Sequence, residues 1–361
     1  MNKHRSIYVL IVSCVLVSLL LLGCGSDSTT PVAYDNSKLS GEYVRLLLSN
    51  TMSSIGDMTF DGAGNFQLDQ VYSMANAAEA ARSDAGTYTV DVNGNLVFDL
   101  SPLPRLTEGA VTTDGVVYSG VQLNNTNSKY VVAGVRPPTG VFDETDLTGD
   151  FHFAFLSFNS GTPHSAFGNI TFYGNGIYNA VGVTSDTLSA GNPYADTGTY
   201  TTAANGRLTL TRSDGYVYNG AISSTVDVIV ASGVKNTTEQ SSMVCLEAGT
   251  GWTTLNSAGT SRASSLKTSG PGLTTTALGS STFDGTGVFS FIGVATTNSG
   301  IKYPVDRPGT YSIMDNGAFT VETTSDGLPS IINGAIRANG KVSLVSQNNI
   351  VEHRLGVNIR Q

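Results

Sequence analysis

The chain has 361 residues, which exceeds one ordinary domain, and its 19 basic against 28 acidic side chains give a formal net charge of −9. Only 13% of its residues are charged and 41 are glycine, a composition that favours short strands joined by many turns over long helices. Because an acidic chain without basic clusters repels phosphate groups, we do not expect nucleic acid as a partner.

The first 23 residues have the organisation of an export signal. Lys3 and Arg5 provide a basic start, an apolar run covers 7–22, and "LLGC" at 21–24 ends it. The run is 16 residues long, shorter than the roughly 20 that span a bilayer, so a cleaved signal is favoured over a retained transmembrane helix. We therefore expect 1–23 to be a signal peptide.

The end of this segment resembles the lipobox of bacterial lipoproteins. Residues 21–23 match the three positions before the cleavage site, and Cys24 matches the cysteine that receives the lipid. The resemblance implies a diacylglycerol thioether on Cys24 and an acyl chain such as palmitate on its amino group, enough for stable anchoring in a membrane. In that family an Asp after the cysteine retains the protein in the inner membrane. Because Gly25 stands there, the resemblance implies the outer membrane, at its periplasmic face or at the cell surface.

The mature chain would hold one free thiol. Cys14 leaves with the signal and Cys24 is lipidated, so Cys245 remains alone and no intrachain disulfide is possible. Its neighbours in "SSMVCLEAG" are typical of a small apolar core residue, and nothing signals the cationic partner of a catalytic thiolate. Loss of Lys3 and Arg5 leaves 17 basic against 28 acidic residues, a net charge of −11.

A polar segment separates Cys24 from the body of the protein. It reads "GSDSTTPVAYDNSK" at 25–38, and we predict that 24–38 is a lipidated tether. At about 3.3 Å per residue it spans roughly 45 Å, which permits reach without fixing the orientation of the body.

Three copies of one unit follow the tether. "IGDMTFDGAGNF" at 55–66 returns as "FGNITFYGNGIY" and "LGSSTFDGTGVF", and the landmarks "GTY" and "NG" return in the same register. Counted from Gly56, Gly86 and Asn93, every landmark recurs after 112 and then 111 residues. Such a fixed period indicates a tandem repeat, which we divide into units at 39–140, 141–250 and 251–361.

The ends of the units align more loosely. "LSGEYV" at 39 and "LTGDFHF" at 147 open the first two units, whereas the third lacks such an opening and is placed near Gly251 and Trp252. Near the other ends we align "VVYSGVQL", "YVYNGAIS" and "SIINGAIR", which leaves an insertion around "SPLPRLTEGAV" in the first unit.

Apolar and polar residues alternate within each unit, which is the period of a strand. The alternation runs through Tyr88 and Val90, reverses at Asn93–Gly94, a strong hairpin signal, and resumes at Leu96. Each unit offers about seven short strands. We therefore predict an all-β fold of three tandem antiparallel β-meanders of about 105 residues, each a small up-and-down barrel or a sandwich. For the alanine-rich stretch 73–82 a helical turn and a plain loop both stay open.

In general plan, the opening "LSGEY" followed by a meander resembles avidin-like and lipocalin-like barrels, and the repeat resembles uncharacterised exported bacterial lipoproteins. No ligand-binding residue of those families is matched here. The resemblance therefore implies a fold and no site.

Two acidic turns imitate calcium loops. "FDGAG" contains Asp61 and "DVNGN" contains Asp91, but Tyr173 replaces the first in the second copy, and Ala203 and Met314 replace the second. A calcium loop needs several oxygen ligands at fixed offsets. The persistent glycines and Asn-Gly pairs instead indicate turn geometry, and we predict no metal and no cofactor.

No pattern indicates catalysis. His152, His164 and His353 are not at metal-ligand spacing and are interpreted as ordinary surface or strand residues. The chain has no G-x-S-x-G, and "GAIRANGKV" and "GNGIYN" depart from the phosphate-loop and dinucleotide-binding patterns. We therefore predict no catalytic residue.

Two further clusters have a plain interpretation. The carboxylates of Asp143, Glu144 and Asp146 are interpreted as a solvated linker between the first two units. Six alternating aromatic residues are expected to fill small β cores, with a cavity or a sugar-binding face as the alternative: Tyr118, Phe153, Phe155, Phe158, Tyr216 and Tyr218.

These observations favour a structural or interaction protein of the cell envelope that is not an enzyme. Its partners would be the membrane, through Cys24, and envelope proteins or polysaccharide. The alternative is a carrier in which each barrel holds one apolar or aromatic ligand, with equal stoichiometry in the three units. A third hypothesis, an envelope hydrolase, requires a site assembled from unmatched residues of different units.

Overall fold

The computed structural model describes residues 33–74, 80–101, 105–124, 129–233, 239–269, 273–325, 328–348 and 351–360. The predicted signal peptide, Cys24 and the tether up to residue 32 lie outside the described residues, as do 75–79 of the alanine-rich stretch. Tyr34–Gln361 forms one compact unit. In the described part of the chain, no helix is both long and apolar enough to cross a bilayer.

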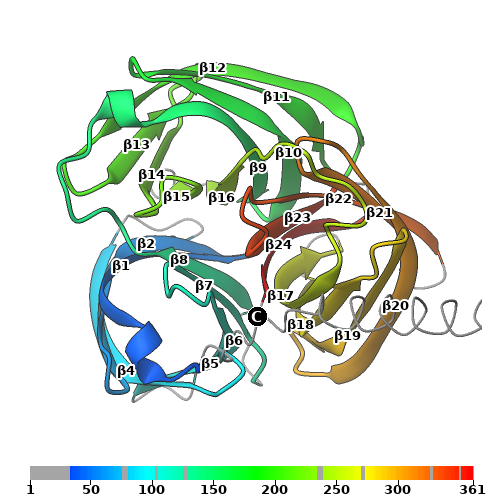
Figure 1. The fold of residues 1–361 in the computed structure, drawn as a ribbon, viewed down its shortest axis with the longest axis horizontal. Coiled ribbons are helices and arrows are strands. Elements are labelled where there is room, and N and C mark those ends of the chain that lie inside the picture. Colours follow the sequence, from blue (N-terminus) through cyan, green and yellow to red (C-terminus); the bar gives the residue numbers. More distant parts are fainter. Residues whose placement is uncertain are drawn as a thin grey trace, which may run out of the picture. The chain divides into compact units, whose positions relative to one another are not determined.

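Three closed antiparallel barrels of eight strands follow one another along the chain (Figure 1). The first contains β1 (Ser40–Ser49), β2 (Met52–Asp61), β3 (Asn65–Met74), β4 (Ala80–Val90), β5 (Asn95–Ser101), β6 (Arg105–Val111), β7 (Val117–Gln122) and β8 (Tyr130–Val135). The second contains β9 (Thr148–Asn159), β10 (Thr162–Tyr173), β11 (Ile177–Ser185), β12 (Asn192–Thr202), β13 (Arg207–Thr211), β14 (Val217–Ile222), β15 (Val228–Gly233) and β16 (Glu239–Glu247). The third contains β17 (Gly259–Thr268), β18 (Thr274–Phe283), β19 (Val288–Thr297), β20 (Lys302–Ile313), β21 (Ala318–Ser325), β22 (Leu328–Ile336), β23 (Val342–Asn348) and β24 (His353–Arg360).

Each barrel is a meander that closes on itself. Strands that follow one another in the chain pair, and the last strand pairs with the first, β8 with β1, β16 with β9 and β24 with β17. The prediction of an all-β fold built from up-and-down barrels is confirmed. Each barrel has eight strands where we expected about seven. The described ends of the alanine-rich stretch, at Met74 and Ala80, belong to strands β3 and β4 and not to a helical turn.

The eighth strand explains a misalignment near the ends of the units. β14 and β22 carry "YNGAI" and "INGAI", and their counterpart is "TEGAV" of β6 and not "VVYSGVQL", which contains β7. At this place Val111 N donates to Gly94 O at 3.1 Å, and the second and third barrels repeat the bond at 3.0 Å. The supposed insertion in the first unit is therefore a regular pair of strands, β5 and β6. The motif alignment did not distinguish β6 from β7 because each strand carries a glycine near its middle. These two glycines, Gly109 and Gly120, lie opposite each other in the strand pair.

Each barrel begins with the same opening. A buried aromatic residue, Tyr34, Phe142 or Trp252, precedes a short turn: η1 (Asn36–Lys38), η2 (Glu144–Asp146) or the turn at 254–257. A glycine with positive φ then starts the first strand, with φ of 86°, 110° and 152° at Gly41, Gly149 and Gly259. The third unit therefore does have an opening, which the sequence comparison missed because "SAG" stands where the others have "LSG" and "LTG". Residues 34–38, which we assigned to the tether, belong to the first barrel.

A tyrosine in each "GTY" landmark ties this opening to the barrel. Tyr88 Oη lies 2.7 Å from Leu39 O, Tyr200 Oη lies 2.9 Å from Leu147 O, and Tyr311 Oη lies 2.9 Å from Thr254 O. The backbone N–H of each tyrosine donates at 2.8 Å to a glycine carbonyl in the turn of "TFDGAGNF" or its copies. The repeated landmarks thus meet at one place in each barrel, and they are repeated because each barrel needs its opening fixed.

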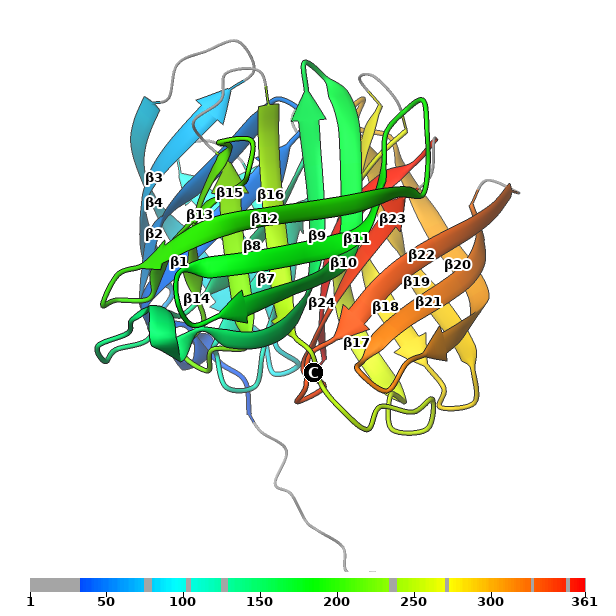
Figure 2. The same ribbon diagram turned by 90° about the horizontal axis from the view of Figure 1, so that it is seen from above.

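The hairpins of every barrel lie at two ends. The entry end carries the opening turns, the repeated tight turns and the end of strand β24, whereas at the loop end β1, β3, β5 and β7 end and β2, β4, β6 and β8 begin, as do their counterparts (Figure 2). Bonds between barrels join like ends. At the loop end, Ser53 Oγ of the first barrel donates to Gly233 O of the second at 2.8 Å, and Thr276 Oγ1 of the third donates to Gln122 O of the first at 2.6 Å. The three barrels are therefore aligned in the same sense.

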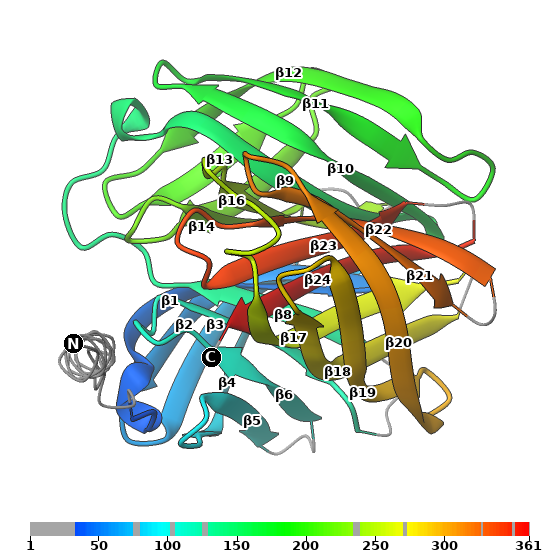
Figure 3. The same ribbon diagram turned by 45° about the vertical axis from the view of Figure 1, so that its right-hand side comes forward.

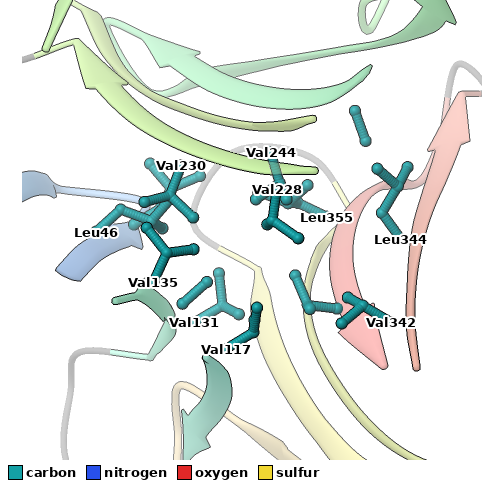
Figure 4. Close-up of a cluster of buried hydrophobic side chains, with 14 of the residues drawn as sticks. Leu46, Val117, Val131, Val135, Val228, Val230, Val244, Val342, Leu344 and Leu355 are labelled. Carbon is teal, nitrogen blue, oxygen red and sulfur yellow. The ribbon is translucent and has the colours of Figure 1, made fainter. Parts of the chain in front are cut away.

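A shared apolar core joins the three barrels (Figure 4). We call it the central core; it contains outward-facing side chains of all three barrels, among them Leu46, Val135, Val230, Val244, Leu344 and Leu355. Strand β24 contacts strands of both other barrels (Figure 3). Strands at this place are buried on both faces, and all six residues of β7, β8 and β15 are buried. Burial on both faces explains why apolar and polar residues do not alternate along these strands.

The interface between the second and third barrels makes stability depend on pH. His353 is fully buried there, with Nδ1 2.8 Å from Ser165 Oγ. Burial, helped by the charge of His164, lowers the pKa of His353 to about 4. The unfolded chain binds the proton at the ordinary pKa of about 6.5, so the free energy of unfolding should fall as the pH drops from about 6.5 through about 4. In urea titrations across this range, His353→Asn should flatten that slope. An equal slope in variant and wild type would contradict the assignment.

Candidate functional site

Aromatic side chains fill most of each barrel, as their alternation predicted. In every barrel a buried phenylalanine packs edge-on against the tyrosine of the opening, with ring centroids 4.9, 5.2 and 4.8 Å apart: Phe60–Tyr88, Phe172–Tyr200 and Phe283–Tyr311. The cavity among these side chains measures about 20 Å³ in the second barrel and about 30 Å³ in the third. Cavities of this size hold water and not an organic ligand.

The six aromatic residues singled out from the sequence are mostly core residues. Tyr118 lies in the core of the first barrel and Phe158 in the central core. Phe153, Phe155 and Tyr218 lie in the core of the second barrel and line its small cavity. Tyr216 is half-buried, with Oη 2.8 Å from Ser241 Oγ.

The first barrel differs from the other two because its loop end contains a cavity of about 240 Å³. Its wall is partly apolar, with Leu47, Met52, Leu68, Met74, Leu100, Tyr72 and Tyr130. Arg45 of β1 and the pair Arg82 and Asp84 of β4 also line it. Arg45 is only 5% exposed, and its chain neighbours Val44 and Leu46 belong to the central core, so its side chain lies on the interior face of β1.

The polar groups of this cavity form one chain of hydrogen bonds. Arg45 Nη1 donates to Gln70 Oε1 at 3.2 Å, and Gln70 Nε2 donates to Asp84 Oδ2 at 3.3 Å. Arg82 donates to Asp84 Oδ1 from Nε at 2.8 Å and from Nη2 at 2.6 Å. The charge of Asp84 is thus engaged by Arg82. Among the described residues, Arg45 takes part in no ion pair.

Ion pairs occupy the loop ends of the other two barrels. Arg212 Nη2 lies 2.8 Å from Asp214 Oδ2 in the second barrel, and Lys267 Nζ lies 2.5 Å from Glu352 Oε1 in the third. Burial alone would raise the pKa of Glu352, but the hydrogen bond and charge of Lys267 prevail and lower it to about 2. The three barrel interiors are therefore chemically different, which argues against three equal ligand sites.

The acidic residues that imitated calcium loops serve their own turns. Asp61 Oδ1 accepts from Ala63 N at 2.7 Å, and Asp91 Oδ1 accepts from Asn93 N at 2.8 Å. A side-chain hydrogen bond from Asn65 is the main cause that lowers the pKa of Asp61 to about 2. Turn chemistry is thus confirmed at both places. Within the described ranges, no group of three or more His, Cys, Asp or Glu side chains is arranged to hold a metal ion.

The interpretation of the acidic segment at 143–146 needs correction, and the two buried histidines need a fuller description. Asp143 and Asp146 are exposed but form the capping box of η2, with Thr145 N donating to Asp143 Oδ1 at 2.8 Å, so this segment opens the second barrel and is not a linker. His152 and His353 lie on strands, β9 and β24, and both are fully buried at the interface of the second and third barrels. His152 Nε2 lies 2.9 Å from Asn316 O, and burial at such an interface requires contacts that no local pattern encodes.

Cys245 fits its prediction as an apolar core residue. It is free and fully buried in the core of the second barrel. Burial raises the pKa of its thiol above the usual range, which keeps the thiol protonated and unreactive.

Sequence reasoning missed Arg45, although a signal was present. In "EYVRLLLS" the interior positions of β1 are Tyr43, Arg45 and Leu47, so a charged residue stands on the core face of a strand. At the corresponding places four residues after the opening glycine, the other two units have Phe153 and Ala263. The copies do not share this charge at the corresponding position, so a site built on Arg45 would be private to the first unit.

Comparisons with known proteins identify no family for this chain. No family model matches it, and no curated protein matches it. Among solved structures, it is similar to isotype 1 transferrin binding protein B (TbpB) from serogroup B Neisseria meningitidis, at 11% identity and a TM-score of 0.30, over 86% of this chain and 66% of that one. It is also similar to a mutant of the vaccine antigen TbpB from Haemophilus parasuis Hp5, at 10% identity and a TM-score of 0.30, over 90% of this chain and 77% of that one. At these TM-scores we base no argument on the likeness.

Proposed function

We propose that this chain is an outer-membrane lipoprotein, anchored through Cys24, whose three-barrel body serves as a binding platform for another protein of the envelope. The central core carries this proposal, because it joins three barrels into one body with a defined entry end and a defined loop end. A body of this kind presents a large composite surface at the loop end.

The position of Tyr34 supports one orientation of the body relative to the membrane. The compact unit begins at Tyr34, at the entry end, so the segment from Cys24 to Ala33 is ten residues long and spans at most about 33 Å. An anchor at Cys24 would hold the entry end toward the membrane and leave the loop end free. The entry end carries the repeated tight turns, whereas the connections at the loop end differ in sequence between the copies. Variable loops on a rigid scaffold are where binding residues are expected.

The experiment compares two exposed apolar residues at opposite ends of the body. Leu188, 90% exposed in the β11–β12 connection, lies at the loop end, and Val92, 75% exposed in the β4–β5 turn, lies at the entry end. Each is replaced by a photo-crosslinking amino acid in cells of the native host. We expect a specific protein adduct from position 188 and none from position 92. Adducts from position 92 alone, or from neither position, would contradict the platform.

The anchor is tested separately. Cys24→Ser protein should leave the outer-membrane fraction, because the lipid that holds it there can no longer be attached. The measurement is fractionation of the native host followed by detection of the chain. If the variant stays in the outer membrane with its signal removed, the body is held there by something other than a lipid.

A further inference from the structure

We infer that the first barrel binds one small organic monoanion, a carboxylate with a short apolar body, through Arg45. This inference goes beyond the platform proposed above and does not depend on it. It starts from a charge that the barrel encloses and that no described residue neutralises. Arg45 is 5% exposed, and the hydrogen bond given for its side chain among the described residues is to the neutral amide of Gln70.

A buried guanidinium is costly unless it is paired. Removing a charge from water costs several kcal/mol, and an opposite charge with good hydrogen-bond geometry is what offsets the loss. The planar guanidinium presents a fork of N–H donors that matches a carboxylate through two parallel bonds. Asp84 does not fill this role, since Arg82 already engages it through two bonds. Of the three charged side chains that line the cavity, two are positive and one is negative, which leaves room for one anion.

The cavity also limits the body of the ligand. Leucine, methionine and tyrosine side chains form most of its wall, so the part of the ligand beyond the carboxylate should be apolar. On the entry-end side of Arg45, the packed rings of Tyr43 and Tyr118 close the interior, with ring centroids 5.8 Å apart. A volume of about 240 Å³ is smaller than the ~300–1,000 Å³ of sites for drug-sized molecules. A short carboxylic acid fits these limits and a long-chain fatty acid does not.

The site belongs to one barrel only. The cavities of the second and third barrels measure about 20 and 30 Å³, and the positions that correspond to Arg45 hold Phe153 and Ala263. The expected stoichiometry is therefore one ligand per chain. This differs from a carrier with one pocket in each unit, which would bind three.

The test is a calorimetric titration of the full lipidated protein in detergent with butyrate and with butanamide. The two probes have nearly the same shape and differ in charge, so the comparison isolates the role of Arg45. We expect one butyrate per chain and an affinity for butanamide at least about tenfold weaker. No butyrate binding, equal affinities, or three butyrates per chain would overturn the inference.

Two variants and a control complete the test. Arg45→Gln should weaken butyrate binding at least about tenfold and abolish the preference over butanamide. Leu100→Trp fills the mouth of the cavity without touching the charge and should also abolish binding, which keeps the inference testable if the first variant does not fold. Lys302→Gln changes the net charge equally on an exposed site of the third barrel and should bind as wild type does. Unchanged butyrate binding in Arg45→Gln or in Leu100→Trp would place butyrate elsewhere and overturn the assignment.

Discussion

Leu46→Ala should destabilise all three barrels together, by about 2–5 kcal/mol of unfolding free energy. Leu46 is 1% exposed, and its side chain lies in the central core, near Val230 of the second barrel (Figure 4). Its truncation removes buried methyl groups and leaves a cavity that the surrounding strands cannot fill completely. Because the central core is common to the three barrels, the loss is not confined to the barrel that carries the substitution.

The single tryptophan makes this prediction measurable. Trp252 lies in the opening of the third barrel, so its fluorescence in a urea titration follows a barrel other than the one that is mutated. We expect the Trp252 transition of Leu46→Ala to shift to lower urea in one cooperative step. The matched control is Leu188→Ala, which truncates a leucine that is 90% exposed and should change stability by no more than about 0.5 kcal/mol. An unshifted Trp252 transition in Leu46→Ala would mean that the barrels unfold independently.

The repeated turns show how much of this fold is local. Asn93–Gly94 and its copies predict tight hairpins, and the structure has one at each place, with φ of 75°, 72° and 88° at Gly94, Gly206 and Gly317. The preceding asparagines are not among the described residues with positive φ, so these are not the type I′ turns that Asn-Gly pairs favour, and the left-handed glycine alone was predicted correctly. Alternation between these turns predicts strands, and a meander of short strands predicts a small barrel. Each of these steps uses residues that are neighbours in the chain, which is why the fold class was accessible.

The central core could not be predicted from neighbours in the chain in the same way. In β1 the interior residues Tyr43 and Leu47 alternate with Val44, Leu46 and Leu48, which are also apolar, so the pattern indicates burial on both faces without saying what covers the second face. The cover comes from strands of the second and third barrels that lie far away in the sequence. The same limit applies to the two buried histidines, whose partners belong to another barrel or to another strand.

The cavity of the first barrel could be predicted from the sequence only in part. Placing Arg45 on the interior face of β1 needs only the period of a strand, because Tyr43 and Leu47 share that face. Knowing that no carboxylate of a described residue pairs with Arg45 needs the registers of β1 with β2 and of β2 with β3, which bring Gln70 beside Arg45 across Gly56. It also needs the Arg82–Asp84 pair within β4. Sequence therefore identifies the charge, and only the fold shows that it is unpaired.

Asp227→Ala should be the most damaging single change at a barrel interface, with an expected loss of about 3–5 kcal/mol. Arg337 of the third barrel is fully buried, and its Nη2 pairs with Asp227 Oδ2 of the second barrel and lies 2.9 Å from Thr225 Oγ1. Nε and Nη1 of Arg337 have no partner among the described residues. Removal of the carboxylate would therefore leave a buried cation without a counter-charge, which costs more than the pair itself contributes.

A double-variant cycle separates the cost of the uncompensated buried cation from the net contribution of the ion pair to stability. Arg337→Met with Asp227→Ala removes both charges and keeps an apolar side chain in the space, so it should recover most of the stability that Asp227→Ala loses. Asp57→Ala is the control, because it breaks the pair with Arg207 between the first and second barrels, where Asp57 is 63% exposed, and should cost at most about 1 kcal/mol. Urea titrations followed by Trp252 fluorescence measure all of these variants. If the double variant is no more stable than Asp227→Ala, the loss comes from packing at the interface and the uncompensated charge is not its cause.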